Sequence, residues 1–338
     1  MKQFESAEGQ PLFVAFSYGL PPDDSTYMHR VSVHAAGADG WDELARVDGE
    51  SVSYLEESGL EQVDFESNAV WMTVRGGTGV HGKCFELLRW DGTSLEVVIS
   101  AFSSAFEAGS LVDLNGDGQI DLLLDISDPY IFCYACGVTQ CLAQLYYWDG
   151  EEFVEGLPTP LTDDHPEDLR ALNDRAGELA NASLFADAPA QIEQAETMAP
   201  GDTTVAWNAV WIRHHLEGSR REASRSGFPL LGHAFAGDWE AAFDLLWEIG
   251  LPTLASDAPI PEEFVAVGSP SSLGIELVEH AAAIAVQPER AAVHALGAWG
   301  RFLVDPTDES ALAGFQQAAE LAPEDSRYGD IVSAFDER

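Results

Sequence analysis

The sequence predicts an α+β protein of two domains, an antiparallel β domain over residues 1–156 and an α-helical domain over residues 157–338. Short runs of β-branched and aromatic residues, separated by Gly, Asp, Asn and Pro, fill the first half of the chain. Alanine-rich segments with helical spacing fill the second half. Between them, LPTPLTDDHPED supplies three prolines and an acidic run, which is typical of a domain boundary.

The strands expected in the β half are short apolar runs at residues 11–19, 29–37, 69–77, 85–90, 95–100, 120–127 and 143–148. An internal repeat groups them. Residues 85–98 and 143–156 each place Trp-Asp-Gly between two strand-like runs, and residues 31–47 hold a weaker copy. Asp-Gly there predicts a tight hairpin, because glycine adopts a positive φ without steric cost. With a further strand before each hairpin, we expect three blade-like antiparallel sheets, as a partial propeller or a sandwich.

Two stretches of the helical half resemble single repeats of known families. Residues 226–252 resemble an ankyrin repeat, with one extra residue before the last glycine, at Gly227, Pro229, Leu230, Ala234, Gly237, Glu240, Leu245, Leu246 and Gly250. Residues 292–325 resemble a tetratricopeptide repeat, with two additional residues in the turn, at Leu296, Gly297, Ala311, Phe315, Ala318 and Pro323. Small residues at these positions let helices pack closely in pairs. We therefore expect an α-helical repeat or an irregular bundle.

The strongest chemical motif is DLNGDGQID, which is rich in oxygen donors at alternate positions. Asp113, Asn115, Asp117 and Asp121 supply side-chain oxygens at positions one, three, five and nine, and the carbonyl of Gln119 lies at position seven. This spacing wraps a hard cation, and the glycine at position six permits the sharp turn that such a loop needs. The motif predicts a divalent-cation site, most readily for Ca²⁺; Mg²⁺ is the weaker choice because it prefers a smaller shell that retains water.

An EF-hand is excluded, because Leu124 stands at position twelve, where a bidentate Glu would be needed. The loop instead resembles those of FG-GAP and related VCBS-type repeats, over about residues 55–156, in which DxNxDGxxD leads directly into a strand of a propeller blade. The resemblance implies a structural Ca²⁺. The alternative is a solvated turn, since Asp, Asn and Gly are turn formers. A degenerate copy with Asp64, Glu66 and Asn68 lacks the glycine and the last aspartate, and we expect it to bind nothing.

The cysteines are distributed unevenly. Cys133, Cys136 and Cys141 lie within CYACGVTQC, whereas Cys84 is alone upstream. Disulfides, structural thiols and a metal site are all open, because Cys-x-x-Cys occurs in zinc and redox motifs. We favour disulfides, since alignment of the repeats places Cys84 beside the position equivalent to Cys141, and since zinc usually takes two such Cys pairs.

The charge balance excludes whole classes of partner. The chain carries 58 acidic and 16 basic residues, a net charge of −42. Nucleic acid is excluded because phosphate binding needs clustered cations, and insertion into a membrane is not expected because no run of about 18 apolar residues occurs. The acidic residues are spread over both halves, which favours solvation of the whole surface over one docking patch.

Signatures of the common enzyme classes are missing from the sequence. It contains no P-loop, His-Glu-x-x-His, Gly-x-Ser-x-Gly or Ser-x-x-Lys motif. The Gly-x-Gly-x-x-Gly match at residues 77–82 precedes a strand-like run, whereas a dinucleotide site needs a helix there. His214 and His215 are adjacent in a helical pattern and so point to different faces, one packed and one solvated.

These observations predict a non-enzymatic, calcium-stabilised binding or scaffold protein that mediates protein–protein interaction. One alternative is an acidic immunity protein or nucleic-acid mimic that binds a basic partner. Another is a hydrolase with an accessory β-repeat domain. The sequence names neither the partner nor the oligomeric state. The compartment is expected to be extracellular or periplasmic if an upstream signal is removed, and cytoplasmic otherwise.

Overall fold

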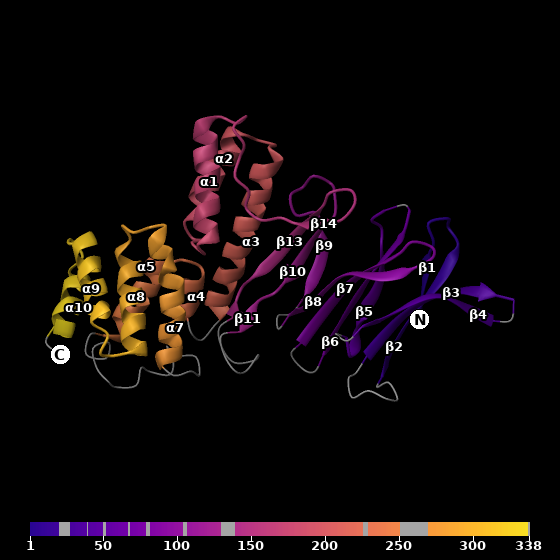
Figure 1. The fold of residues 1–338 in the computed structure, drawn as a ribbon, viewed down its shortest axis with the longest axis horizontal. Helices are drawn as coiled ribbons and strands as arrows, with labels where there is room; N and C mark the ends of the chain where they lie inside the picture. Colours follow the sequence, from indigo (N-terminus) through magenta and orange to yellow (C-terminus); the bar gives the residue numbers. More distant parts are fainter. Residues whose placement is uncertain are drawn as a thin grey trace. The chain divides into compact units, whose positions relative to one another are not determined.

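A computed structural model places the strands and helices of the chain (Figure 1), and it describes residues 1–19, 28–38, 40–49, 52–66, 68–78, 82–103, 107–129, 139–225, 229–250 and 270–336. The chain divides into two compact units. The first comprises Met1–Asp128 and Ala143–Glu155, and the second comprises Pro129–Leu142 and Gly156–Arg338. The predicted order of antiparallel strands followed by helices is confirmed. The assignment of Pro129–Leu142 to the second unit is a feature that the sequence did not suggest.

The described part of the first unit holds three four-stranded sheets, each an antiparallel meander in chain order. The first contains β1 (Lys2–Glu5), β2 (Pro11–Gly19), β3 (Met28–Gly37) and β4 (Gly40–Gly49). The second contains β5 (Tyr54–Val63), β6 (Val70–Thr78), β7 (Gly82–Trp90) and β8 (Leu95–Ser103). The third contains β9 (Gly109–Val112), β10 (Asp121–Asp125), β13 (Ala143–Trp148) and β14 (Phe153–Glu155). The short strands β11 (Asp128–Pro129) and β12 (Thr139–Gln140) pair separately.

The second sheet is buried on both faces. Alternate residues of β6 point to opposite sides, so Val70 and Met72 pack with residues of the first sheet while Trp71 packs with residues of the third. Accordingly, β6 and β7 are buried along almost their whole length, whereas a strand with one solvated face would alternate buried and exposed residues. The first unit therefore has two cores, one on each side of its second sheet.

The Trp-Asp-Gly sequences form the hairpins that were predicted for them. They join β7 to β8 and β13 to β14, the third and fourth strands of two sheets. The glycines, Gly92 and Gly150, have φ of 97° and 106°, which a side chain would strain. The Asp91 carboxylate accepts hydrogen bonds, both of 2.8 Å, from the amides two and three residues further along the chain. The Asp149 carboxylate accepts the equivalent two hydrogen bonds, at 2.8 and 2.9 Å. Local chemistry thus sets both turns.

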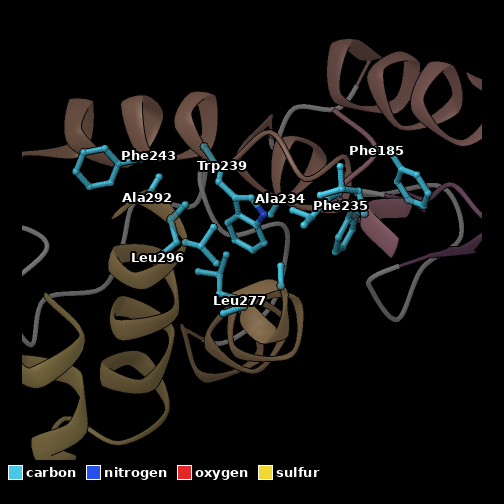
Figure 2. Close-up of a cluster of buried hydrophobic side chains, with 14 of the residues drawn as sticks. Phe185, Ala234, Phe235, Trp239, Phe243, Leu277, Ala292 and Leu296 are labelled. Atoms are coloured by element: carbon cyan, nitrogen blue, oxygen red, sulfur yellow. The ribbon is translucent and has the colours of Figure 1, made fainter. Parts of the chain in front are cut away.

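The second unit is a succession of packed helices. These are α1 (Glu167–Asn181), α2 (Ala188–Met198), α3 (Thr203–Arg225), α4 (Pro229–Phe235), α5 (Trp239–Ile249), α7 (Pro270–His280), α8 (Ala291–Val304), α9 (Glu309–Leu321) and α10 (Ser326–Asp336), with a 3₁₀ turn η1 (Ala281–Ala285). Figure 2 shows Trp239 and Phe243 of α5 beside Leu277 and Leu296 of α7 and α8, inside the core that runs through this unit. None of the described helices combines the length and the apolarity needed to cross a membrane.

Glycines mark the closest helix contacts in this unit. A Cβ at Gly274 of α7 would lie 2.5 Å from the carbonyl oxygen of Gly300 of α8. A Cβ at Gly232 of α4 would lie 2.5 Å from Cα of Ala223 of α3. Small residues therefore do allow backbone contact, and Gly237 of the ankyrin-like stretch is one of them, since a Cβ there would lie 2.6 Å from the carbonyl oxygen of Ser183.

Candidate metal centre

The loop from Asp113 to Asp121 connects the first and second strands of the third sheet, β9 and β10. Gly116 and Gly118 have φ of 77° and 85°, left-handed conformations that glycine adopts without steric cost. Nothing within 4 Å would oppose a Cβ at either glycine, so the backbone conformation alone accounts for them. The loop then enters β10 directly, as the motif predicted.

Asp113 organises the loop from its first position. Its Oδ1 accepts hydrogen bonds from the amides of Gly116 at 2.7 Å and Asp117 at 3.1 Å, and its Oδ2 accepts one from Gly118 at 2.9 Å. Asn115 and Asp117 are joined directly, because Nδ2 of Asn115 donates to Oδ2 of Asp117 at 3.0 Å. The structure thus brings three of the predicted ligands together at the turn.

Asp121 lies at the base of the loop, where it is only 1% exposed. Its Oδ2 accepts a hydrogen bond from the Leu114 amide at 2.9 Å. Burial raises the pKa of Asp121 to about 6, the hydrogen bond from Leu114 opposes the rise, and the carboxylates of Asp117 and Asp113 add to it. Three acidic groups therefore crowd one small volume, with the innermost held away from water.

The chemical type of the donors, all oxygen, suits a hard divalent cation. Every predicted ligand offers oxygen, and the mutual repulsion of three carboxylates is the electrostatic situation that a cation relieves. The side chains are nevertheless turned toward loop amides, and no group of three or more His, Cys, Asp or Glu among the described residues has the arrangement of a metal site. The Gln119 side chain is exposed, so its predicted contribution is through the main-chain carbonyl alone.

The degenerate copy lies at the matching place in the second sheet, between β5 and β6. Its Phe65 points into the core, with its ring centroid 5.0 Å from that of Trp71 and 4.9 Å from that of Trp148. This segment is thus anchored by an aromatic cluster rather than by a ring of carboxylates. That it binds no cation stays a prediction.

The cysteines do not come together as a described cluster. Cys133 and Cys136 lie outside the described residues. Cys84 lies on β7, whereas Cys141 precedes β13 and so does not occupy a matching strand. The Sγ of Cys141 lies against α3, where a Cβ at Gly218 would be 2.1 Å from it. The described residues form no disulfide bond, and both cysteine side chains are buried. Any pairing that involves residues 133 and 136 stays a prediction.

Burial makes Cys84 a poor nucleophile. Loss of solvent, with a smaller effect from the Glu86 carboxylate, raises the pKa of the Cys84 thiol to about 11. At pH 8 about one molecule in a thousand then carries the reactive thiolate. We expect iodoacetamide to label Cys84 in the native protein at least about 100-fold more slowly than in the urea-unfolded protein. Peptide mass spectrometry measures both rates, and equal rates would contradict the buried position.

The remaining sequence motifs have structural roles. Within the Gly-x-Gly-x-x-Gly match, Gly77 and Thr78 end β6 and Gly82 begins β7, so a strand follows the match as expected, and residues 79–81 lie outside the described part of the chain. His215 is buried, with its ring 3.8 Å from that of Trp211, and the ring plane of His214 is turned 84° from it. The expectation of one packed histidine is confirmed.

One hydrogen-bonded chain was missed by sequence reasoning. Thr162 Oγ1 lies 3.3 Å from His165 Nδ1, and His165 Nε2 lies 3.1 Å from Asp202 Oδ2. The order of groups is that of a hydroxyl–imidazole–carboxylate triad. Asp202, however, accepts the Val205 amide at the start of α3, and that hydrogen bond is the main reason that its pKa is lowered. Neither the cavity lined by residues 158–160 and α1 nor the one lined by residues of α7 and α8 includes these three side chains, so we assign this hydrogen-bonded group to capping of α3.

Comparison with protein-family models, with curated proteins and with solved structures finds no match for this chain. Its function must therefore be argued from its own residues.

Proposed function

We propose that this protein is a non-enzymatic scaffold in which a divalent cation, Ca²⁺ in particular, stabilises a β-repeat unit joined to a helical protein-binding unit. The observation that carries the cation part is the Asp113–Asp121 loop, where oxygen donors with the required spacing surround a buried carboxylate. Fold alone does not determine function, so the binding part depends on the surfaces described below.

Three meander sheets of four strands support the finer interpretation of the first unit as blades of a partial propeller. The candidate loop and its degenerate copy both follow the first strand of a sheet, and the Trp-Asp-Gly hairpins both follow a third strand. Such equivalence is what a repeated unit requires. The FG-GAP or VCBS-type character of the repeat is part of the same proposal.

The cation would be held by side-chain oxygens of Asp113, Asn115, Asp117 and Asp121 and by the main-chain carbonyl of Gln119. Bound there, it would supply positive charge where three carboxylates now repel one another. The chain's own part is to hold the loop between β9 and β10 in one conformation, through the amide hydrogen bonds to Asp113. The role proposed is structural.

Calcium is expected to raise the stability of the protein. We predict that protein stripped with EDTA melts at a lower temperature than protein in excess CaCl₂, by the equivalent of about 2.7 kcal/mol at 100 times the dissociation constant. Differential scanning calorimetry measures the difference. Mg²⁺ at the same concentration should give a smaller rise, because its small octahedral shell gives up water reluctantly.

Substitutions in the Asp113–Asp121 loop test whether the calcium-dependent rise in melting temperature comes from this loop. Asp113→Ala and the nearly isosteric Asp117→Asn should each reduce the calcium-dependent rise, whereas Asp64→Ala in the degenerate copy should retain it. Asp117→Asn guards against simple unfolding of the loop, since an amide oxygen can still accept the Gln119 amide. If calcium has no effect on the parent protein, or has the same effect on all three variants, the cation part of the proposal fails.

A further inference from the structure

A cavity of about 490 Å³ lies on the helical unit, between residues 158–160 and one face of α1. Its apolar lining includes Pro158, Pro160 and Val286, and its polar lining includes Asp174 and Asn181. A volume of this size is within the range of small-molecule and side-chain binding pockets. We call this cavity the α1 groove.

One wall of the α1 groove is held firmly by buried amides. Asn208 Oδ1 accepts the Thr159 amide at 2.9 Å, and the side chains of Asn208 and Asn173 both donate to the Thr159 carbonyl, at 2.8 and 3.0 Å. Asn173 and Asn208 are 0% and 1% exposed. Nδ2 of Asn208 also donates to Oδ1 of Asn173 at 2.8 Å. The two prolines on either side of Thr159 are thereby fixed, so the groove is preformed and an occupant need not order it.

Gly177 forms part of the lining, and no contact with the other residues that the structure describes requires a glycine there. It is a buried glycine inside α1, where alanine would be more stable by about 1 kcal/mol. A Cβ at Gly177 would meet only Pro158, at an ordinary contact distance of 3.6 Å, whereas Gly232, Gly274 and Gly300 are each needed for a helix contact. Within the described part of the chain, the space above Gly177 is open, so an occupant from outside has room there.

The charge of the α1 groove selects the occupant. Asp174 Oδ1 accepts the Leu161 amide at 3.1 Å and the Asn173 side chain at 3.2 Å, which fixes the carboxylate. Its Oδ2 has no hydrogen-bond donor, and no cation pairs with it, among the residues that the structure describes. Glu178 differs, because Arg175 already pairs with it at 2.5 Å. Asp174 is therefore an exposed carboxylate at the groove that has no ion pair among the described residues.

We propose that the α1 groove binds an arginine side chain presented by an extended segment of a partner protein, an inference that rests on the proposed scaffold function. The methylene stem would pack on Pro158 and Pro160, and the guanidinium would donate to Oδ2 of Asp174. Arginine suits the site better than lysine, because its planar, weakly hydrated cation can lie against apolar walls while it donates to a carboxylate. The net charge of −42 would speed the encounter with such a partner at low salt.

A single-arginine peptide tests the proposal directly. The probe is fluorescein-labelled Ala-Leu-Arg-Leu-Ala with blocked ends, and its control replaces arginine by citrulline, which has nearly the same shape without the charge. Fluorescence anisotropy on the full chain in 50 mM NaCl should show saturable binding of the arginine peptide, and at least about 10-fold weaker binding of the citrulline peptide, which equals about 1.4 kcal/mol. Equal affinity for the two peptides would overturn the proposal.

Matched variants place the binding in the α1 groove. Asp174→Asn, which keeps an oxygen acceptor for the Leu161 amide, should weaken binding about 10-fold, and Gly177→Leu should abolish it. Gly177→Ala keeps the helix and should weaken binding while the melting temperature rises. The controls Asp330→Asn and Gly329→Ala on α10 make the same changes at exposed positions and should leave binding unchanged.

The outcomes separate this proposal from the others. Salt-sensitive binding that persists in all the α1 variants would overturn the groove and favour the acidic-surface alternative. Loss of the calcium effect together with intact groove binding would overturn the cation site alone. Stabilisation by calcium without peptide binding would overturn the groove and leave the scaffold proposal standing.

Discussion

Replacing His29 by leucine is expected to lower the free energy of unfolding of the β unit by about 3–5 kcal/mol. His29 on β3 and Glu86 on β7 are 1% and 2% exposed, and their Nε2 and Oε2 atoms are 2.8 Å apart. The pair joins the first sheet to the second inside an apolar core. Without the imidazole, the Glu86 carboxylate would lose this partner where little water can replace it.

Urea unfolding measures the loss, and hydrogen exchange in peptides from β3 and β7 assigns it to this unit. Glu86→Gln should cost less, since the amide can still bond to the imidazole. The double variant His29→Leu with Glu86→Leu should recover most of the stability, because an apolar pair of similar volume often replaces a buried polar pair without loss. If the losses of His29→Leu and of Glu86→Leu, each measured alone, simply add in the double variant, the contact between the two side chains is not the cause.

The parts of this fold that could be predicted from sequence are those set by neighbours in the chain. Asp91 and Asp149 fold their own hairpins through amides two and three residues away, so Trp-Asp-Gly was sufficient to locate two turns. The Asp113–Asp121 loop is equally local, because its hydrogen bonds span no more than seven residues. Spacing along the chain therefore carried the information.

The parts that escaped prediction depend on residues far apart in the sequence. His29 and Glu86 are 57 residues apart, and a lone polar residue in a strand is usually interpreted as facing water. The same applies to Asn173 of α1 and Asn208 of α3, which bond to each other and both donate to the Thr159 carbonyl. The pattern of polar and apolar residues gives the face of a strand but not its partner.

Glycine was the most ambiguous residue of the helical half. In sequence, Gly177 and Gly274 are both helical glycines, and both were consistent with close packing of helices. In the structure only Gly274 has backbone from another helix against it, while the space beside Gly177 is open. A glycine that lets two helices touch can be told from a glycine that lines a groove only when the position of the neighbouring helix is known.

Gly274→Val is accordingly expected to destabilise the helical unit strongly. The new Cβ would lie 2.5 Å from the Gly300 carbonyl oxygen and 2.9 Å from the Leu303 Cβ, so α7 must move away from α8. Overpacking of this kind costs about 3 kcal/mol, against a gain in helix propensity of only about 0.5 kcal/mol. The melting temperature of the helical unit, followed by circular dichroism at 222 nm, should fall by roughly 5–10 °C.

Gly329→Val is the matched control for that experiment, because Gly329 lies in α10 and nothing within 4 Å would oppose its Cβ. The same valine there should change the melting temperature by a small fraction of the loss at Gly274. Gly177→Ala should shift it upward, since the α1 groove has room for a methyl group. The loss at Gly274 beside the small change at Gly329 would show the effect of the space next to each Cα, whereas equal effects of valine at the two positions would show that helix propensity alone governs them.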